Sequence, residues 1–386
     1  MKKLFNTYLK GDPVIWIIVF ILSVFGILAV YSSTGTLAYV ERGGNTEYYL
    51  IKHTALLLFG LFAMWLTHLV NIQYFSRLSQ VLLILSVPLL LYTLFFGVEI
   101  NDAKRWMSLP GIGLTIQTSD IAKLALIMFV ARFMAKRQHE VHDFKKTFLP
   151  ILAIIMGICL LIFPEDFSTS AVLFFTSLLI LFIGRIPIKQ LGLLFGIGAI
   201  IFGSLIAYVW NNDVEFGRIE TMKSRVESFM ENSDDGGTYQ NQQAKIAVAR
   251  GKLWGKGPGN SRQKNLLPSP FADFIYAIII EEYGSILGGL GLIVLYLLLL
   301  YRAFRIVIHT KNSMAALMAI GLCFSLVIQA FINMGVAVNI LPVTGLALPI
   351  VSRGGTSILF TSIAFGIILS ASRTIYQHRE DENESA

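Results

Sequence analysis

Long apolar runs separated by short polar segments dominate this chain. A helix that crosses a lipid bilayer needs about 20 mostly apolar residues. Ten segments meet or approach that length: about 14–34, 50–70, 78–98, 120–135, 148–163, 168–184, 190–210, 274–300, 313–334 and 352–372. The pattern therefore predicts an all-α polytopic membrane protein with ten transmembrane helices, of which the fifth and sixth are short.

The composition agrees with this pattern and excludes other classes of protein. Hydrophobic residues make up 55% of the 386 residues and charged residues only 14%, against roughly 25% charged in an average soluble domain. The mean hydropathy of +0.67 excludes a soluble enzyme, a disordered chain and a disulfide-stapled secreted domain. The two cysteines, Cys159 and Cys323, lie within apolar runs and are predicted to be packing residues.

The positions of the basic residues predict how the chain is oriented. The run from Val14 to Val30 is too long for the core of a cleaved signal peptide, so we expect a retained first span. With the N-terminus in the cytoplasm, sixteen Lys and Arg residues fall in inside segments and six in short outside segments. The positive-inside rule therefore predicts that both termini, including a tail at about 373–386, are cytoplasmic. Because the basic residues are scattered between spans, nucleic acid is not an expected partner.

One long polar loop, at about 211–273 between the seventh and eighth spans, is predicted to be extracytoplasmic. Gly217 to Met230 carries apolar residues at spacings of three and four, which predicts an amphipathic helix on the outer interface. A second short helix is expected from Tyr239 to Leu253. The stretch from Gly255 to Lys264 is not a P-loop, and we interpret it either as a backbone cradle for a phosphate or as a flexible surface loop.

Three carboxylates surround the start of the eighth span. Asp273 opens the span, and Glu281 and Glu282 follow two to three turns further in. An aspartate in this position can simply cap a helix. Glutamates within an apolar zone are expensive and usually functional. We therefore favour carboxylates that line a water-filled cavity open to the outside.

Two further clusters are candidates for chemistry. Arg105 beside Trp106 is either an interface anchor or part of a site, and the spacing from Asp120 to Lys123 places opposite charges on one helix face. That second pair is either structural or a binding site for a diphosphate. From Asn333 to Thr356, Asn, Pro and Gly interrupt an otherwise apolar run. Broken backbone at membrane depth is tolerated only where it is buried in protein or lines a cavity.

Together these clusters closely resemble the SEDS family of bacterial cell-wall polymerases over nearly the whole chain. The motifs that carry the resemblance are ordered along the sequence: Lys104-Arg105-Trp106 with Leu109-Pro110-Gly111, Gln117-x-Ser119-Asp120-x-x-Lys123, Asp166-Phe167-Ser168-Thr169, Gly255-x-Gly257-x-Gly259-x-Ser261-x-Gln263-Lys264, Asp273-Phe274-Ile275-Tyr276-Ala277, Glu281-Glu282-x-Gly284, and Asn339-x-Leu341-Pro342-x-Thr344-Gly345 followed by Ser352-x-Gly354-Gly355.

The chain departs from the family pattern at several of these positions. Phe271-Ala272 stands where the family usually has His-Thr before the aspartate, and Arg353 stands where it has Tyr. Asp120 replaces a Glu, and the Pro and Gly around Asp166 are missing.

The resemblance implies a single membrane domain over 1–386 that polymerises lipid II into glycan strands. It assigns the essential carboxylate to Asp273. The candidate substrate-binding residues are Arg105, Lys123, Lys264, Gln263, Ser261, Glu281 and Ser352. No metal ligand is assigned, and a requirement for Mg²⁺ or Mn²⁺ is left open. The Pro-x-Thr-Gly form at Pro342–Gly345 favours the division branch of the family over the elongation branch.

The implied partners are lipid II, a cognate class B penicillin-binding protein and other divisome proteins, at the cytoplasmic (inner) membrane with the site facing outward. Two alternatives to the enzyme are a transporter that flips lipid II and a non-enzymatic scaffold. No convincing internal repeat of the kind found in transporters is present in the sequence.

The predicted orientation can be tested with reporters. A reporter fused after Ala386, or inserted near His139, should be cytoplasmic, because short loops rich in basic residues stay in the cytoplasm. A reporter inserted near Asp235 should be extracytoplasmic. A cytoplasmic signal at Asp235 would contradict the orientation and every role assigned to the outer loop.

Overall fold

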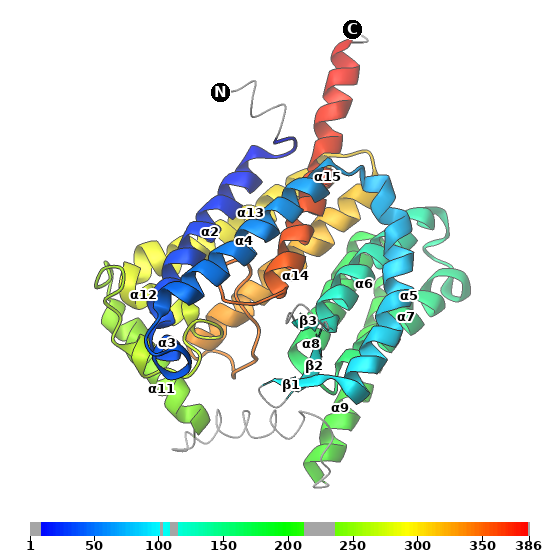
Figure 1. Ribbon diagram of the computed structural model, residues 1–386. Helices are drawn as coiled ribbons and strands as arrows, with labels where there is room; N and C mark the ends of the chain where they lie inside the picture. The colour runs from blue at the N-terminus through cyan, green and yellow to red at the C-terminus, as the bar shows by residue number, and fades with distance from the viewer. Residues whose placement is uncertain (1–8, 101–102, 109–114, 212–235, 385–386) are drawn as a thin grey trace.

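The computed structural model describes residues 9–100, 103–108, 115–211 and 236–384. Helices form most of this part of the chain (Figure 1). The principal helices are α2 (Pro13–Ser33), α4 (Thr46–Leu69), α5 (Ile72–Phe96), α6 (Thr118–Lys136), α7 (Leu149–Ile162), α8 (Phe167–Ile183), α9 (Ile188–Asn211), α11 (Gly236–Gly251), α12 (Ile275–Gly284), α13 (Gly291–His309), α14 (Ser313–Ala337) and α15 (Ser357–Glu384).

Shorter elements connect these helices. They are α3 (Gly35–Arg42), the single turns Gln138–Glu140, Phe144–Phe148, Gln263–Asn265 and Ser285–Leu290, and the strands β1 (Val98–Ile100), β2 (Ala103–Ser108) and β3 (Thr115–Gln117). The strands form an antiparallel sheet in the order β1-β2-β3. The sequence pattern did not predict this sheet.

The helices agree with a polytopic membrane protein. Within the described residues, seven helical segments are long and apolar enough to cross a bilayer, and two shorter apolar helices span Phe167–Ile183 and Ile188–Ser204. α6, which carries Asp120, Lys123 and Arg132, covers the predicted segment at about 120–135. The chain is therefore an all-α multi-pass membrane protein with one small accessory sheet.

Local sequence explains where several helices begin. Asp12 precedes Pro13 and caps α2, and its Oδ1 accepts a hydrogen bond from the amide of Val14 at 2.9 Å. Asn71 and Asn312 cap α5 and α14 in the same way. Each cap satisfies amides that have no partner within the helix, which a bilayer would not hydrate.

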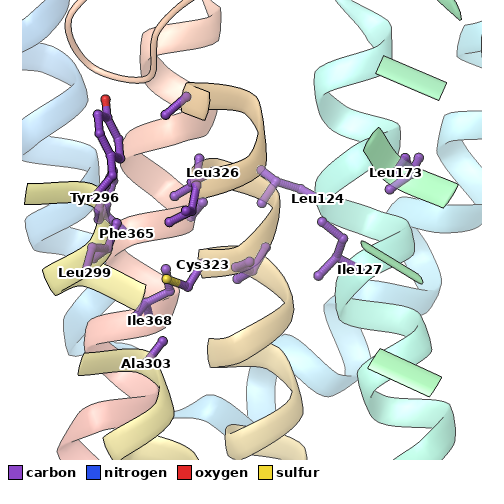
Figure 2. Close-up of a cluster of buried hydrophobic side chains, with 14 of the residues drawn as sticks. Leu124, Ile127, Leu173, Tyr296, Leu299, Ala303, Cys323, Leu326, Phe365 and Ile368 are labelled. Carbon is purple, nitrogen blue, oxygen red and sulfur yellow. The ribbon is translucent and has the colours of Figure 1, made fainter. Parts of the chain in front are cut away.

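The centre of the bundle is α14. Its apolar side chains pack against α13 and α15 on one side and against α6 and α8 on the other, as Figure 2 shows around Cys323 and Leu326. Cys159 and Cys323 are both buried and free, which confirms that they are packing residues. The outer helices α4 and α5 instead expose large apolar side chains such as Phe59 and Ile84, as expected of surfaces that face lipid.

The two ends of the described chain are tied together at one end of the bundle. Arg302 Nε on α13 donates to Asp12 Oδ2 at 2.6 Å, and the amide of Asp12 donates to Ser372 Oγ on α15 at 3.0 Å. The start of α2 and the end of α15 therefore lie on the same side of the molecule (Figure 1). An even number of crossings would produce this arrangement.

The opposite end of the bundle gathers the small sheet, α3, α11 and the segment 338–356 (Figure 1). Residues 338–356 form no regular helix, which confirms the predicted break. The tenth helix accordingly begins at Ser357 and not at 352 as predicted, because Pro349 and Gly354-Gly355 do not support a helix there.

The long polar loop before the eighth span is only partly as expected. The second predicted helix, Tyr239 to Leu253, is confirmed by α11. The first, Gly217 to Met230, lies outside the described residues. Beyond this loop the eighth span is not one regular helix, since Ser285–Leu290 forms a wider turn between α12 and α13.

Gly284 allows the loop after α11 to approach α12 closely. Its φ is +83°, and a Cβ at this position would lie 2.2 Å from the carbonyl oxygen of Leu253. The contact is between backbones, so the added atom cannot be accommodated by a side-chain movement.

Gly284→Ala should therefore lower the thermal stability of the purified protein markedly, since an unfavourable φ alone costs roughly 1–3 kcal/mol. Gly192→Ala on α9 is the control, because a Cβ there meets nothing within 4 Å. Equal melting temperatures for the two variants in a detergent-based unfolding assay would contradict this reading of the loop.

Candidate active site

The turn that carries Asp273 is fixed through the backbone carbonyls of the residues before it. Asp273 lies two residues before the start of α12. Phe271 O accepts a hydrogen bond from the amide of Arg353 at 3.0 Å, and Ala272 O accepts one from Ser352 Oγ at 2.8 Å. Asp273 itself is half-buried. The backbone that carries its carboxylate is therefore fixed at the edge of the bundle.

Two buried amide side chains on α14 complete this arrangement. Asn333 Nδ2 donates to Asp273 O at 3.1 Å and to Leu346 O at 2.8 Å. One turn earlier, Gln329 Nε2 donates to Ala347 O at 2.8 Å. The bonds to Leu346 O and Ala347 O satisfy carbonyls of the broken segment 338–356. Backbone groups that water does not reach need such partners within the protein.

Ser352 has two roles in the same segment. Its Oγ accepts from the amide of Leu348 at 2.8 Å and donates to Ala272 O. The side chain is 1% exposed. The structure thus places this predicted substrate-binding residue beneath the turn that carries Asp273, where it holds the backbone.

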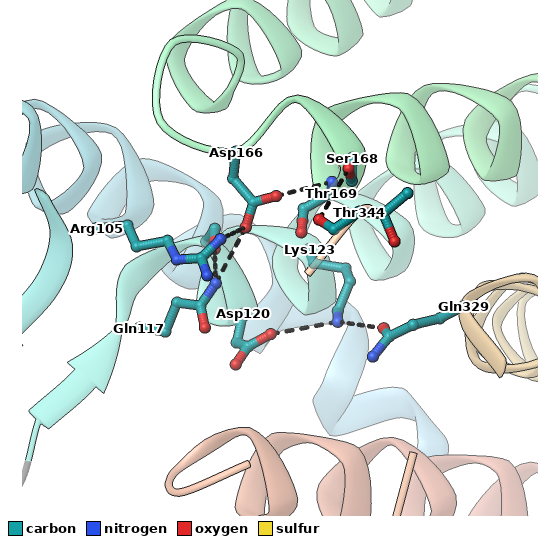
Figure 3. Close-up of polar contacts among 10 residues, drawn as sticks. Arg105, Gln117, Asp120, Lys123, Asp166, Ser168, Thr169, Gln329 and Thr344 are labelled. Carbon is teal, nitrogen blue, oxygen red and sulfur yellow. Dashed lines mark hydrogen bonds and ion pairs between the residues drawn. The ribbon is translucent and has the colours of Figure 1, made fainter. Parts of the chain in front are cut away.

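A second cluster is built around Asp166, which caps α8. Its Oδ1 accepts from the amide of Thr169 at 3.0 Å, while Oδ2 accepts from Arg105 at 2.7 Å and from Gln117 Nε2 at 3.2 Å (Figure 3). The sheet sets this geometry, because Trp106, next to Arg105 on β2, pairs with Gln117 on β3. The Arg105 guanidinium is therefore already engaged with a carboxylate.

Lys123 connects this region to the core helix. Its Nζ donates to Asp120 Oδ1 and to Gln329 Oε1, each at 3.2 Å (Figure 3). The predicted pairing of Asp120 with Lys123 on one face of α6 is confirmed. Through Gln329, the same lysine is linked to the broken segment that supports Asp273.

Two further contacts join the second cluster to the broken segment. Ser168 Oγ donates to Thr344 O at 3.2 Å, and Thr356 Oγ1 donates to Thr115 O at 3.0 Å. Motifs far apart in the sequence thus meet at one end of the bundle. The cavity beside Arg105 and Asp166 has a volume of about 10 Å³, about the space of one water.

The third cluster surrounds Glu281, which is fully buried. Its Oε2 accepts from Ser261 Oγ at 2.5 Å and from the amide of Gln263 at 3.2 Å, and its Oε1 accepts from the amide of Arg262 at 3.3 Å. Lys256 Nζ lies 3.8 Å from Oε1. Two predicted substrate-binding residues, Ser261 and Gln263, therefore both bond to a third, Glu281.

Glu282 extends this cluster to α2. Ser32 Oγ donates to Glu282 Oε1, and Lys264 Nζ donates to Ser32 Oγ at 3.4 Å and to Gly259 O at 2.7 Å. Glu282 is 1% exposed and Glu281 is 0% exposed. The expectation that these glutamates line an open, water-filled cavity is therefore wrong, because the loop after α11 covers both of them.

The first amides of the glycine-rich stretch from Gly255 to Lys264 are bonded within the protein. They therefore form neither a phosphate cradle nor a flexible loop. The amide of Lys256 donates to Glu281 O at 3.0 Å, and that of Gly257 donates to Glu282 O at 2.9 Å. These donors fasten the loop to the end of α12. The glycines serve a close backbone approach, which the sequence alone could not distinguish from anion binding.

Sequence reasoning missed Asn333 and Gln329 as supports of the site. Both are polar residues in an otherwise apolar run, and that contrast is the signal that could have identified them. Among the residues that the structure describes, no three His, Cys, Asp or Glu side chains are grouped to hold a metal ion.

The fold defines a multi-pass membrane protein, and hydrogen bonds at one end of its helix bundle fix the backbone turn that carries Asp273. Residues 12–377 match the family model described as "Cell cycle protein", the family of FtsW, RodA and SpoVE. The chain belongs to this family, which is the SEDS family.

Individual relatives agree with the family assignment. A "Probable peptidoglycan glycosyltransferase FtsW" from Haemophilus influenzae is 34% identical, with 92% of this chain and 88% of the relative covered. A protein of the same name from Nitrosococcus halophilus is also 34% identical, over 85% of this chain and 84% of the relative. Stage V sporulation protein E of Bacillus subtilis is 32% identical, over 94% and 97%.

Solved structures show the same fold. One, described as "Structural coordination of polymerization and crosslinking by a peptidoglycan synthase complex", matches with a TM-score of 0.70 and 26% identity over 95% of this chain and 99% of that chain. The crystal structure of the rod shape determining protein RodA of Thermus thermophilus matches with a TM-score of 0.67 and 22% identity over 95% of this chain and 98% of that chain.

The ion pair between Arg105 and Asp166 generates a prediction about stability. Arg105→Ala leaves a carboxylate buried without its charge partner, and such a change costs up to roughly 3–5 kcal/mol. Asp166→Ala should also destabilise the protein, yet the double variant should lose less than the sum, since the two residues act as a pair.

Unfolding of purified variants in detergent measures these effects. Lys146→Ala is the control, because Lys146 lies at 4.0 Å from Glu140 and Asp143 in an exposed cluster, where ion pairs contribute little. Additive losses for Arg105 and Asp166 would show that the pair is not an energetic unit.

Proposed function

We propose that this SEDS-family peptidoglycan glycosyltransferase polymerises lipid II into glycan strands on the outer face of the cytoplasmic membrane, for septal wall synthesis. The family description and the names of the relatives from Haemophilus influenzae and Nitrosococcus halophilus support the activity and the link to the cell cycle. Within the chain, the support is the fixed position of Asp273 at the edge of the bundle.

Asp273 is the proposed general base. In glycan extension a sugar hydroxyl attacks an anomeric carbon that carries a lipid diphosphate. A hydroxyl is a poor nucleophile until a base within hydrogen-bond reach removes its proton. The observation that carries this role is the set of bonds from Arg353, Ser352 and Asn333 to three successive carbonyls ending at Asp273. Such a support keeps the backbone that carries the carboxylate in one position while the acceptor approaches.

The cations Arg105, Lys123 and Lys264 are the proposed partners of the diphosphate. Negative charge develops on the leaving group, and positioned cations stabilise it most strongly where water is scarce. Arg105 and Lys123 have side chains that are only 17% and 12% exposed. The Nε of Arg105 is buried and has no hydrogen-bond partner among the described residues.

We also propose that the whole chain is one membrane domain with ten crossings and cytoplasmic termini. The ten helical segments and the contacts of Asp12 with Arg302 and Ser372 support this topology. With the chain in that orientation, Asp273 faces the periplasm or the cell exterior. The substrate must then arrive already activated, since ATP is absent there, and a diphosphate-linked sugar meets that requirement.

The proposed protein partner is a class B penicillin-binding protein that crosslinks the new strands, together with other divisome proteins. A solved structure described as a peptidoglycan synthase complex that coordinates polymerization and crosslinking has the same fold as this chain at 26% identity. A polymerase and a crosslinking enzyme in one complex act on the same strand without its release.

Asp273→Asn tests the proposed base. The amide keeps the shape of the side chain but cannot accept a proton, and loss of a general base costs about two to four orders of magnitude in rate. Strand synthesis from purified lipid II, with the class B partner present, should fall by that factor while the variant remains folded.

Asp143→Asn is the matched control. Asp143 also stands just before a helical segment and caps it through its side chain, but it is separated from the site by the length of the bundle under the proposed topology. Its variant should polymerise normally. Near-normal strand synthesis by Asp273→Asn would overturn the assignment, and Glu281 or Glu282 would become the next candidate.

A further inference from the structure

The side chain of Arg353 lies between two aromatic rings from distant parts of the chain. Its guanidinium carbon is 4.8 Å from the centre of the Tyr49 ring on α4 and 5.0 Å from the centre of the Phe271 ring. Both distances are within the range of cation–π attraction, for which guanidinium groups are well suited. The stack therefore connects α4 to the residue two positions before Asp273.

The backbone of Arg353 also contacts Phe271. Its amide donates to Phe271 O at 3.0 Å. Phe271 is thus fixed at its carbonyl and at its ring by one partner, whereas Ala272 is fixed only at its carbonyl, by Ser352. Rotation of the turn about its backbone would have to break both contacts of Phe271 together.

The segment that presents Arg353 is itself fixed in an unfavourable conformation. Ile350 has a φ of +67°, a region that a β-branched residue rarely adopts. Tyr296 Oη donates to Pro349 O at 2.6 Å. A Cβ on Gly26 would lie 2.9 Å from Ile350 O, so α2 also packs directly on this turn. Surroundings that maintain such a conformation are typical of sites where position matters.

Arg353 and Phe271 thus contact each other through both their backbones and their side chains. The stacked guanidinium of Arg353 helps to fix the orientation of the backbone of 271–273. Asp273, the last residue of this turn, carries the proposed reactive group.

We propose that Arg353 is a positioning residue: stacked between Tyr49 and Phe271, it fixes the turn that presents the Asp273 carboxylate and couples α4 to that turn. This inference rests on the proposed role of Asp273. It predicts that disrupting the stack slows turnover without weakening the binding of lipid II, because the carboxylate is misplaced while the groups that hold the diphosphate are unchanged.

Steady-state kinetics of strand synthesis from purified lipid II test the proposal. Phe271→Leu keeps an apolar side chain but removes the ring, and Arg353→Met keeps length but removes the charge. Each should lower kcat by about 10–100-fold, as misplacement of a reacting group does, with little change in KM. The double variant should be no slower than the slower single variant, since each change disrupts the same stack.

Two further variants separate positioning from a general loss of structure. Phe271→Tyr restores a ring and should recover most of the kcat lost in Phe271→Leu. Phe133→Leu is the matched control, because the guanidinium of Arg137 lies 4.7 Å from the Phe133 ring at the far end of α6, about 25 Å along the helix from its start. That variant should leave kcat unchanged.

Three results would overturn the proposal. A raised KM with unchanged kcat in Arg353→Met would make Arg353 a ligand for the substrate. Multiplicative losses in the double variant would show that the two side chains act independently. Wild-type kcat in both single variants would show that the stack has no role. In each case Asp273→Asn, measured in the same assay, reports separately whether the proposed base is correct.

Discussion

Backbone that leaves a helix within a bilayer must find hydrogen-bond partners inside the protein, and this constraint organises the site. The helical structure is interrupted between α14 and α15. The side chains of Gln329 and Asn333 on α14 donate hydrogen bonds to carbonyls of the interrupted segment. Asn333 satisfies Leu346 O and, with the same amide group, Asp273 O. The bonds that make an irregular segment tolerable are therefore also the bonds that position the carboxylate.

A second consequence is that the polar groups at this end of the bundle are connected. Lys123 bonds Gln329, and Gln329 bonds the broken segment. Asp166 joins the cap of α8 to the guanidinium of Arg105. Hydrogen bonds that form a chain polarise one another in a medium of low dielectric. Loss of one member therefore affects groups that it does not touch, and activity alone does not distinguish a ligand of the substrate from a support.

The sequence was most informative where physical signals are local. Long apolar runs located the helices, and the clustering of Asn, Pro and Gly located the break at 338–356. The partner of Arg105 could not be read from the sequence, because Asp166 is distant along the chain and stands in an altered motif. The burial of Glu281 and Glu282 was also missed, since it depends on a loop that folds back onto α12 through its amides. The small sheet escaped prediction because its strands are only three to six residues long.

The central claim is that the Asp273 carboxylate meets the hydroxyl that attacks the donor sugar. An experimental structure with an unreactive lipid II analogue bound as acceptor tests it most directly. The account predicts the attacking hydroxyl within hydrogen-bond distance of an Asp273 oxygen, about 2.6–3.2 Å, with the turn 271–273 still held by Arg353, Ser352 and Asn333. A hydroxyl bonded instead to another carboxylate, with Asp273 remote from both sugars, would contradict it.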